Sequence, residues 1–252
     1  MMQIESACAC NIGLRRRNNE DNFYFDKRYL EADNMGLQDI LTTTDACFGE
    51  QFFAVFDGMG GEDFGEVASY TAAKTLEKNV KKGKSFLKEK ERFLYELALD
   101  LNRQVFDVGQ ERGTDRMGST FVMLYFAGKE VYLCNLGDSR GYRLRGYDFY
   151  QISQEHVEDE MYARGSKPGL IQFLGMDPER YVVEPFLTKG RIEKGDKYLI
   201  CSDGVTDMLD DDEICDIMAN AKHARECVDR LIEASLERGG CDNTTAIVCF
   251  IK

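Results

Sequence analysis

Acidic side chains beside glycine or asparagine recur at widely separated points of this 252-residue chain. They are Glu20-Asp21, Asp57-Gly58, Asp138, Asp203-Gly204 and Asp242-Asn243. Most of them stand at the end of a hydrophobic run, as Asp57 does after residues 51–56. A carboxylate that leaves a strand is held rigidly, and a following glycine lets the backbone turn so that its carbonyl can also face a ligand. Several carboxylates gathered without matching bases repel one another, and a hard divalent cation such as Mg²⁺ or Mn²⁺ removes that repulsion.

Each of these pairs has a simpler interpretation when it is taken alone. Asp-Gly is among the commonest turn dipeptides, so Asp57-Gly58 and Asp203-Gly204 are each typical of a plain turn. Glu20-Asp21 suits a solvated loop, and Asp242-Asn243 suits an ordinary Asx turn. Only their occurrence together in one chain favours a shared site.

The strands that must position these residues are predicted from short runs rich in β-branched and aromatic residues. They cover residues 22–26, 52–56, 119–126, 131–136, 140–145, 149–152, 197–201 and 244–250. Gly128-Lys129 and Arg145-Gly146 are typical of hairpin turns, which join antiparallel strands. We therefore predict antiparallel sheets.

Four helices are predicted from apolar residues at helical spacing. They span residues 65–80, 93–108, 210–220 and 224–237. Gly113 is a C-terminal signal for the second helix, and Asp210 with Glu213 has the spacing of a capping box for the third. Residues 30–50 are expected to form a loop, with a polar turn at the threonines 42–44. The order of strands and helix pairs predicts an α+β fold, and the lack of a linker or repeat favours a single domain over residues 1–252.

The composition limits the class of protein and its partners. Hydrophobic residues make up 43% and charged residues 31% of the chain, as is typical of a globular protein. The formal charge of −13 repels nucleic acid and anionic lipid, and no apolar stretch approaches the ~20 residues of a membrane span. Nine scattered cysteines without a signal peptide favour reduced thiols and a cytoplasmic location.

Taken together, the acidic motifs resemble those of the metal-dependent serine/threonine protein phosphatases of type 2C, in the bacterial form of that family. The matching segments are residues 16–22 (RRNNEDN), 55–61 (VFDGMGG), 65–69 (GEVAS), 117–120 (MGST), 135–140 (NLGDSR), 201–207 (CSDGVTD) and 241–245 (CDNTT). They follow the order of the family and extend the resemblance over nearly the whole chain. The resemblance implies a four-layer sandwich of two packed antiparallel β-sheets, with an antiparallel helix pair outside each sheet.

The resemblance also implies a site for two ions of Mn²⁺ or Mg²⁺. Asp57 would bridge both ions, and the carbonyl of Gly58 would complete the shell of one of them. Glu20 would serve one ion, directly or through water, while Asp203 and Asp242 would hold the other.

Further roles follow from the same resemblance. Asp138, together with Asp203, resembles the third and weaker metal site of bacterial members. Asp21 would hydrogen-bond a metal-bound water, and Arg16 would grip the substrate phosphate, which its planar fork suits better than a lysine would. Asp57, Asp21 and Arg16 are thus the expected catalytic residues.

The implied activity is hydrolysis of phosphoserine and phosphothreonine in proteins by direct attack of a water activated by the two metals. Met59 stands where many eukaryotic members carry a histidine suspected of protonating the leaving group. That acid role is therefore unassigned. His156 is one candidate for it, and a surface histidine, or one placed behind the site, is the simpler interpretation.

Two other functions compete with this one. A non-catalytic, phosphatase-like regulatory module would be expected to have lost metal ligands, yet all the expected carboxylates are present. A two-metal nuclease would need a basic groove, which the net charge disfavours. We expect a monomer that acts in signalling and dephosphorylates proteins, among them a serine/threonine kinase and its substrates. We expect it to bind neither nucleic acid nor membrane.

Overall fold

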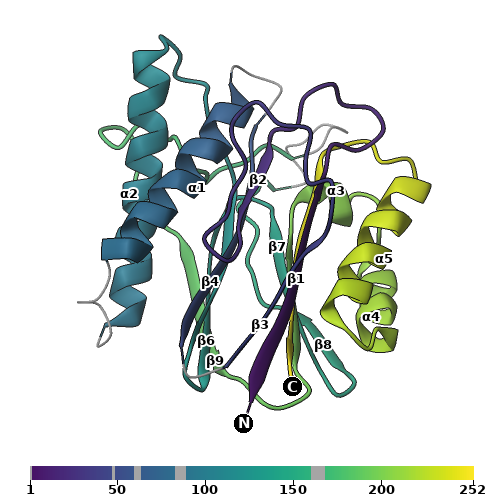
Figure 1. The fold of residues 1–252 in the computed structure, drawn as a ribbon. Coiled ribbons are helices and arrows are strands. Elements are labelled where there is room, and N and C mark those ends of the chain that lie inside the picture. The colour runs from purple at the N-terminus through teal and green to yellow at the C-terminus, as the bar shows by residue number, and fades with distance from the viewer. Residues whose placement is uncertain (1, 47–48, 60–63, 83–88, 160–167) are drawn as a thin grey trace.

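The computed structural model describes residues 2–46, 49–59, 64–82, 89–159 and 168–252 (Figure 1). Its strands form two sheets in which every neighbouring pair is antiparallel. The first sheet has the order β3 (Leu41–Ala46), β1 (Gln3–Asn11), β11 (Thr244–Ile251), β10 (Lys197–Cys201), β7 (Arg140–Arg145), β8 (Asp148–Gln151). The second has the order β2 (Asp21–Tyr24), β4 (Glu50–Asp57), β5 (Phe121–Ala127), β6 (Glu130–Leu136), β9 (Phe186–Arg191). The predicted antiparallel sheets are confirmed.

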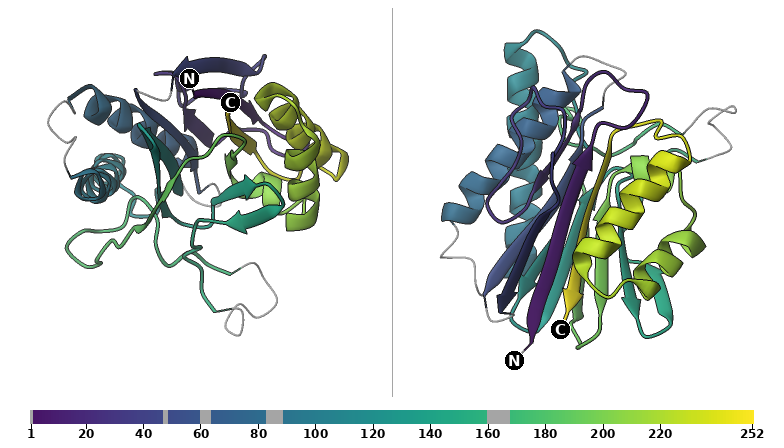
Figure 2. Two further views of the ribbon diagram at one scale, coloured as in Figure 1. Left: turned by 90° about the horizontal axis from the view of Figure 1, so that it is seen from below. Right: turned by 45° about the vertical axis from the view of Figure 1, so that its right-hand side comes forward.

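Helix pairs cover the outer faces of the two sheets (Figure 2). The helices are α1 (Gly65–Lys82), α2 (Lys90–Glu111), the short α3 (Asp203–Thr206), α4 (Asp211–Asn220) and α5 (Ala224–Glu237). One apolar core lies between α1, α2 and the second sheet, another between the two sheets, and a third between the first sheet and α4 and α5. Three cores between four layers confirm the predicted α+β sandwich.

The helix termini agree with the sequence signals. Gly113, just beyond α2, has φ +77°, a conformation that glycine adopts readily. At the start of α4, the Glu213 amide donates to the Asp210 carboxylate at 2.9 Å, and the Asp210 amide donates to the Glu213 carboxylate at 3.2 Å. The predicted capping box is confirmed.

Three strands differ from the prediction: the edge strands β3 and β9, and β1, which was not among the predicted strands. Residues 41–46 form β3, paired with β1 along the outside of the first sheet, and not the expected polar turn. Its side chains are exposed or half-buried, so no hydrophobic alternation marks it. β9 was not predicted at all, because Lys189 and Gly190 weaken its β signal.

All the acidic motifs lie at one end of the sandwich. β2 begins with Asp21, β4 ends with Asp57, and β11 begins two residues after Asp242. Asp138 lies between β6 and β7, and Asp203 lies two residues beyond the end of β10. This end is opposite the one at which the two chain termini lie in Figure 1. The antiparallel topology therefore brings carboxylates from five distant segments to a common surface.

Candidate metal centre

Asp21 and Asp57 face each other across two neighbouring strands. The register of β2 and β4 places them directly opposite. The Asp57 backbone is fixed on its other side by Thr120, whose hydroxyl accepts from the Asp57 amide at 3.1 Å and whose amide donates to the Asp57 carbonyl at 2.8 Å. The Thr120 hydroxyl is itself hydrogen-bonded to Ser139 at 2.6 Å. Asp57 is therefore held at a rigid strand end, as expected.

The electrostatic environment of Asp57 is strongly unfavourable for its own charge. Burial raises the pKa of the Asp57 carboxyl well above its usual range, and the nearby carboxylates of Asp203, Asp21 and Asp138 raise it further. These four side chains come from four separate motifs of the sequence. Because a charge shifts the pKa of another group only over a short distance, these effects mean that the four side chains lie close together.

Asp21 is buried and only partly hydrogen-bonded. Its Oδ2 accepts from the Ser202 hydroxyl at 2.7 Å, while its buried Oδ1 has no hydrogen-bond partner. Burial, with added repulsion from Asp203 and Asp242, raises the pKa of Asp21 to about 7. A buried carboxylate oxygen without a partner destabilises the fold, and a hydrogen-bond donor or a cation would remove this cost.

Glu20 and Gly58, which were predicted to serve one ion, lie side by side. The Gly58 amide donates to the Glu20 carbonyl at 3.1 Å. A Cβ atom on Gly58 would lie 2.2 Å from the Gly65 carbonyl oxygen and 2.7 Å from that of Glu20, so only glycine fits this turn. Burial raises the pKa of Glu20, and Glu66 raises it further.

Asp138 and Asp203 share a cavity of about 280 Å³ at the edge of the cluster. Arg140 lines the same cavity and forms an ion pair with Glu155 at 3.1 Å. Asp207 contributes a further carboxylate to the lining. The two residues assigned to the weaker third site are thus neighbours in space, although they lie 65 positions apart in the sequence.

Arg16 reaches the cluster through Asp242. Its Nη2 lies 2.6 Å from Asp242 Oδ2, in an ion pair that is partly open to solvent. That hydrogen bond raises the pKa of Arg16, and the charges of Glu20 and Asp57 raise it further. The guanidinium expected to bind phosphate is therefore present at the cluster, where it contacts an expected metal ligand.

Asn243 connects the segments of the cluster through hydrogen bonds, a role that was not predicted from the sequence. Its Nδ2 donates to the carbonyls of Ile12 and Asn18 at 2.9 and 3.0 Å, and its Oδ1 accepts from the Glu20 amide at 2.8 Å. Its own amide donates to the Asp242 carboxylate at 2.8 Å, a bond between adjacent residues and not the i to i+2 bond of an Asx turn. The signal that could have found it is an asparagine directly after a candidate ligand, with one side-chain amide able to satisfy several backbone groups.

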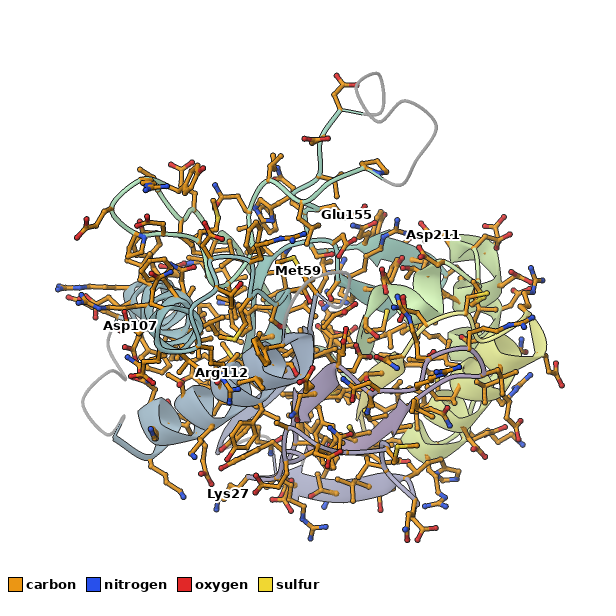
Figure 3. The ribbon with its side chains drawn as sticks, turned by 90° about the horizontal axis from the view of Figure 1, so that it is seen from above. Lys27, Met59, Asp107, Arg112, Glu155 and Asp211 are labelled. Atoms are coloured by element: carbon orange, nitrogen blue, oxygen red, sulfur yellow. The ribbon has the colours of Figure 1, made fainter. Side chains whose placement is uncertain are left out.

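Met59 and His156 lie close to the cluster without joining it. The Met59 amide donates to the Gly118 carbonyl at 3.0 Å, and Met59 and Glu155 lie near the middle of the view from above in Figure 3. His156 is buried rather than at the surface; its amide donates to the Gly137 carbonyl at 3.0 Å, and its buried Nδ1 has no partner. Burial lowers the pKa of His156. The glycines 60 and 61 of the motif lie outside the described residues.

The donor set fits a hard divalent cation. It consists of carboxylate and carbonyl oxygens, carries raised pKa values caused by burial and like charge, and includes the unpartnered Oδ1 of Asp21. Across the part of the chain that the structure describes, no three acidic, histidine or cysteine side chains form a ready-made metal cage. Mg²⁺ and Mn²⁺ suit such an open arrangement because water supplies several of their ligands.

Comparison with known proteins identifies the family. The sequence profile described as Protein phosphatase 2C matches residues 30–239. The serine/threonine protein phosphatase PstP of Mycobacterium tuberculosis is 30% identical over 98% of this chain, which spans 45% of the length of PstP. The serine/threonine phosphatase stp of Listeria welshimeri is 31% identical over 77% of this chain and 82% of its own length.

A solved structure of a related protein has the same fold. The catalytic domain of the phosphatase PstP, crystallised with two manganese ions, superposes with a TM-score of 0.74. The two sequences are 27% identical, and the match covers 100% of this chain and 99% of that one. The similarity thus extends over the complete sandwich, including all five acidic segments.

Proposed function

The chain belongs to the protein phosphatase 2C family, and on this basis we propose that it hydrolyses phosphoserine and phosphothreonine in proteins with the help of Mn²⁺ or Mg²⁺. The observation that carries the proposal is the position of Asp57. Its carboxylate lies among Asp21, Asp138 and Asp203, whose charges raise its pKa. Such a cluster is costly to a folded protein and becomes favourable once cations bind it.

We assign the residues of the cluster as follows. Asp57 would contact both ions, with Glu20 and the Gly58 carbonyl on one side and Asp203 and Asp242 on the other. Asp138, with Asp203, would hold a third and weaker ion. When bound, the two central cations supply positive charge that activates a water molecule and neutralises the phosphoryl group.

Arg16 and Asp21 would act on the substrate and on water. Only one guanidinium nitrogen of Arg16 is used by Asp242, so its other N–H groups remain to bind phosphoryl oxygens in a bidentate manner. The Oδ1 of Asp21 can accept a hydrogen bond from a water at the centre, because Ser202 engages only the other oxygen. Ser202 and Thr120 would keep the two aspartates in place.

We propose that residues 1–252 form one phosphatase domain that acts as a monomer in the cytoplasm. The eight cysteines that the structure describes are all free thiols, as suits a reducing compartment. No helix in the described part of the chain is long and apolar enough to cross a bilayer. The proposed substrates are phosphorylated proteins, among them a serine/threonine kinase and its targets.

The test is phosphate release from a phosphothreonine peptide by the purified chain. We expect turnover with added Mn²⁺, none with a chelator, and full recovery when Mn²⁺ is restored. Asp57→Asn is expected to lower kcat/KM by roughly 10³-fold or more, because a single catalytic unit is broken. Asp229→Asn, on the exposed face of α5, is the matched control and should retain activity.

Calorimetric titration with Mn²⁺ separates an enzyme from a binding module. A metal-dependent enzyme gives a saturable heat that Asp57→Asn diminishes and Asp229→Asn preserves. Turnover that survives the chelator, or an Asp57→Asn variant with normal kcat/KM, would contradict the proposed function.

A further inference from the structure

A second cavity, of about 280 Å³, lies between the two sheets at their open edge. The strands that end the two sheets on this side, β8 and β9, both border it. Its lining residues are Val131, Leu133, Arg143, Tyr150, Ile152, Thr188, Lys189, Gly190 and Tyr198. Within β10, three residues or about 10 Å of strand separate Tyr198 from Cys201, at the end where Asp203 follows. The cavity is therefore distinct from the acidic cluster.

One wall of this cavity lacks a side chain. Gly190 of β9 is paired with Val131, a residue of the core between the sheets. A Cβ atom on Gly190 would meet no atom within 4 Å, so the space in front of it is open. Its φ is not positive, and larger residues are therefore compatible with its backbone. In most sandwiches this position would carry a side chain that fills the space between the sheets.

The opposite wall carries an arginine, Arg143, and one buried nitrogen of its guanidinium has no hydrogen-bond partner. Arg143 alternates along β7 with Tyr142 and Leu144, which face the helix side of the sheet. Its buried Nε has no hydrogen-bond partner, and its guanidinium lies over the ring of Tyr150 at 5.7 Å. None of the described residues that line the cavity is acidic.

Two neighbouring cations, Arg145 and Lys189, are paired with carboxylates. Arg145, two residues further along β7, is clamped by Asp196, with Nε to Oδ1 and Nη2 to Oδ2 distances of 2.7 Å each. Lys189 pairs with Glu91 at 2.7 Å. In a chain with a net charge of −13, the guanidinium of Arg143 instead faces an apolar space.

We propose that this cavity binds a small carboxylate with an apolar body, such as a medium-chain fatty acid or an aromatic acid. The carboxylate accepts from Nε and one Nη of Arg143, in the bidentate geometry that guanidinium and carboxylate share. The apolar body lies between Leu133 and Ile152, in front of Gly190. A volume just below the ~300–1,000 Å³ of usual ligand pockets limits the ligand to a small molecule.

The experiment compares octanoate with octan-1-ol, which has the same apolar body and no charge. Calorimetric titration of the full chain is expected to give saturable octanoate binding that is about tenfold or more tighter than that of the alcohol, because a charge-assisted hydrogen bond is lost with the alcohol. Arg143→Met should lower the affinity for octanoate by about tenfold and leave that for octan-1-ol unchanged. Arg103→Met, at an exposed position of α2, is the matched control.

Gly190→Leu tests the cavity independently of the charge. Its side chain would occupy the open space and abolish binding of both probes, and Gly190→Val serves if the leucine variant fails to unfold cooperatively. Equal affinity of the two probes for the native chain, octanoate binding that persists in the filled variant, or no saturable heat with octanoate would each overturn the proposal. No phosphatase assay enters the comparison, so its outcome is independent of the proposed function.

Discussion

At the scale of single residues, Asn243 links segments that lie far apart in the sequence. It joins the segment of residues 12–20 to the start of β11 through three side-chain hydrogen bonds. One of these bonds holds the backbone of Glu20, and Asn243 itself follows Asp242. A positioning residue of this kind controls how well its neighbours can bind a cation, although it contributes no ligand of its own.

Asn243→Ala is therefore expected to weaken metal binding. The Mn²⁺ concentration for half-maximal activity should rise about 10–100-fold, as is usual when the support of a ligand is removed. The free energy of unfolding should fall by about 1–3 kcal/mol, because buried backbone groups lose their partners. Mn²⁺ titrations of activity measure the first quantity, and urea unfolding measures the second.

Asn243→Asp is the matched variant. It keeps an acceptor for the Glu20 amide and loses the two donated bonds to Ile12 and Asn18. An intermediate metal requirement is expected. If both variants needed no more Mn²⁺ than the native chain, Asn243 would have no part in positioning the ligands.

The sequence identifies the carboxylates better than their supports. Asp57 and Asp203 stand in recognisable motifs at strand ends, and these motifs predict that they gather. The bond from Ser202 to Asp21 spans 181 residues, and that from Asn243 to Asn18 spans 225. Such contacts depend on the packing of the two sheets, which no local pattern encodes.

At the scale of elements, the start of α4 is specified locally. Asp210 and Glu213 lie within one turn and satisfy each other's backbone amides. Asp210→Ala is expected to lower the free energy of unfolding by about 1 kcal/mol, because the first turn loses its cap. Phosphatase activity at saturating Mn²⁺ should not change, since α4 lies on the outer face of the first sheet.

Asp212→Ala is the control for this effect. Asp212 is an exposed acidic residue in the same first turn and does not cap the helix. Urea unfolding of the two variants measures the difference. An equal loss of stability in both would mean that the charge in the first turn, and not the capping box, stabilises α4.

The edge strands β3 and β9 are among the elements that the sequence specifies least. α2 and α5 were predicted because one face of each is continuously apolar. β3 and β9 each pair with a single neighbour, and their side chains are mostly exposed or half-buried. Pairing with β1 and β6 makes them strands, so tertiary contact outweighs a weak local preference.

At the scale of the whole molecule, we expect the cluster to make the stability of the fold depend on cations. Burial of mutually repelling carboxylates destabilises the metal-free chain, and any ion that binds only the folded state stabilises it. Mn²⁺ at about 100 times its Kd is expected to raise the free energy of unfolding by about 2.7 kcal/mol. Asp57→Asn should be at least as stable as the native chain without metal and should gain little from Mn²⁺. Thermal unfolding with and without chelator tests this, and equal gains in both proteins would contradict it.

A second global link joins the two ends of the chain to α5. Glu5 of β1 lies beside β11, and its Oε1 accepts from the amide of Ala224, the first residue of α5, at 2.9 Å. Lys252 approaches its Oε2 at 3.2 Å. The side chain of the N-cap residue His223 does not cap this helix. The carboxylate of Glu5, from the first strand, accepts the hydrogen bond from the first helical amide instead.

This link gives stability a defined dependence on pH. Burial alone would raise the pKa of Glu5, but the Ala224 amide and Lys252 outweigh it and hold the pKa below its usual range. The folded state therefore favours the carboxylate, and its contribution is complete above the unfolded value of about 4.3. The contribution is lost as the pH falls through the lowered folded value.

Glu5→Gln should accordingly cost about 1–2 kcal/mol at neutral pH, and the difference from the native chain should disappear in acid. Urea unfolding between pH 8 and pH 3 measures it, with both proteins also compared in a His223→Gln background to remove the imidazole 3.3 Å from Glu5. A difference that stayed constant from pH 6 to pH 3 would mean that the side chain stabilises by packing and not by charge. A difference that vanishes only in acid would show that the charge of this one carboxylate stabilises the junction of the first strand, the last strand and α5.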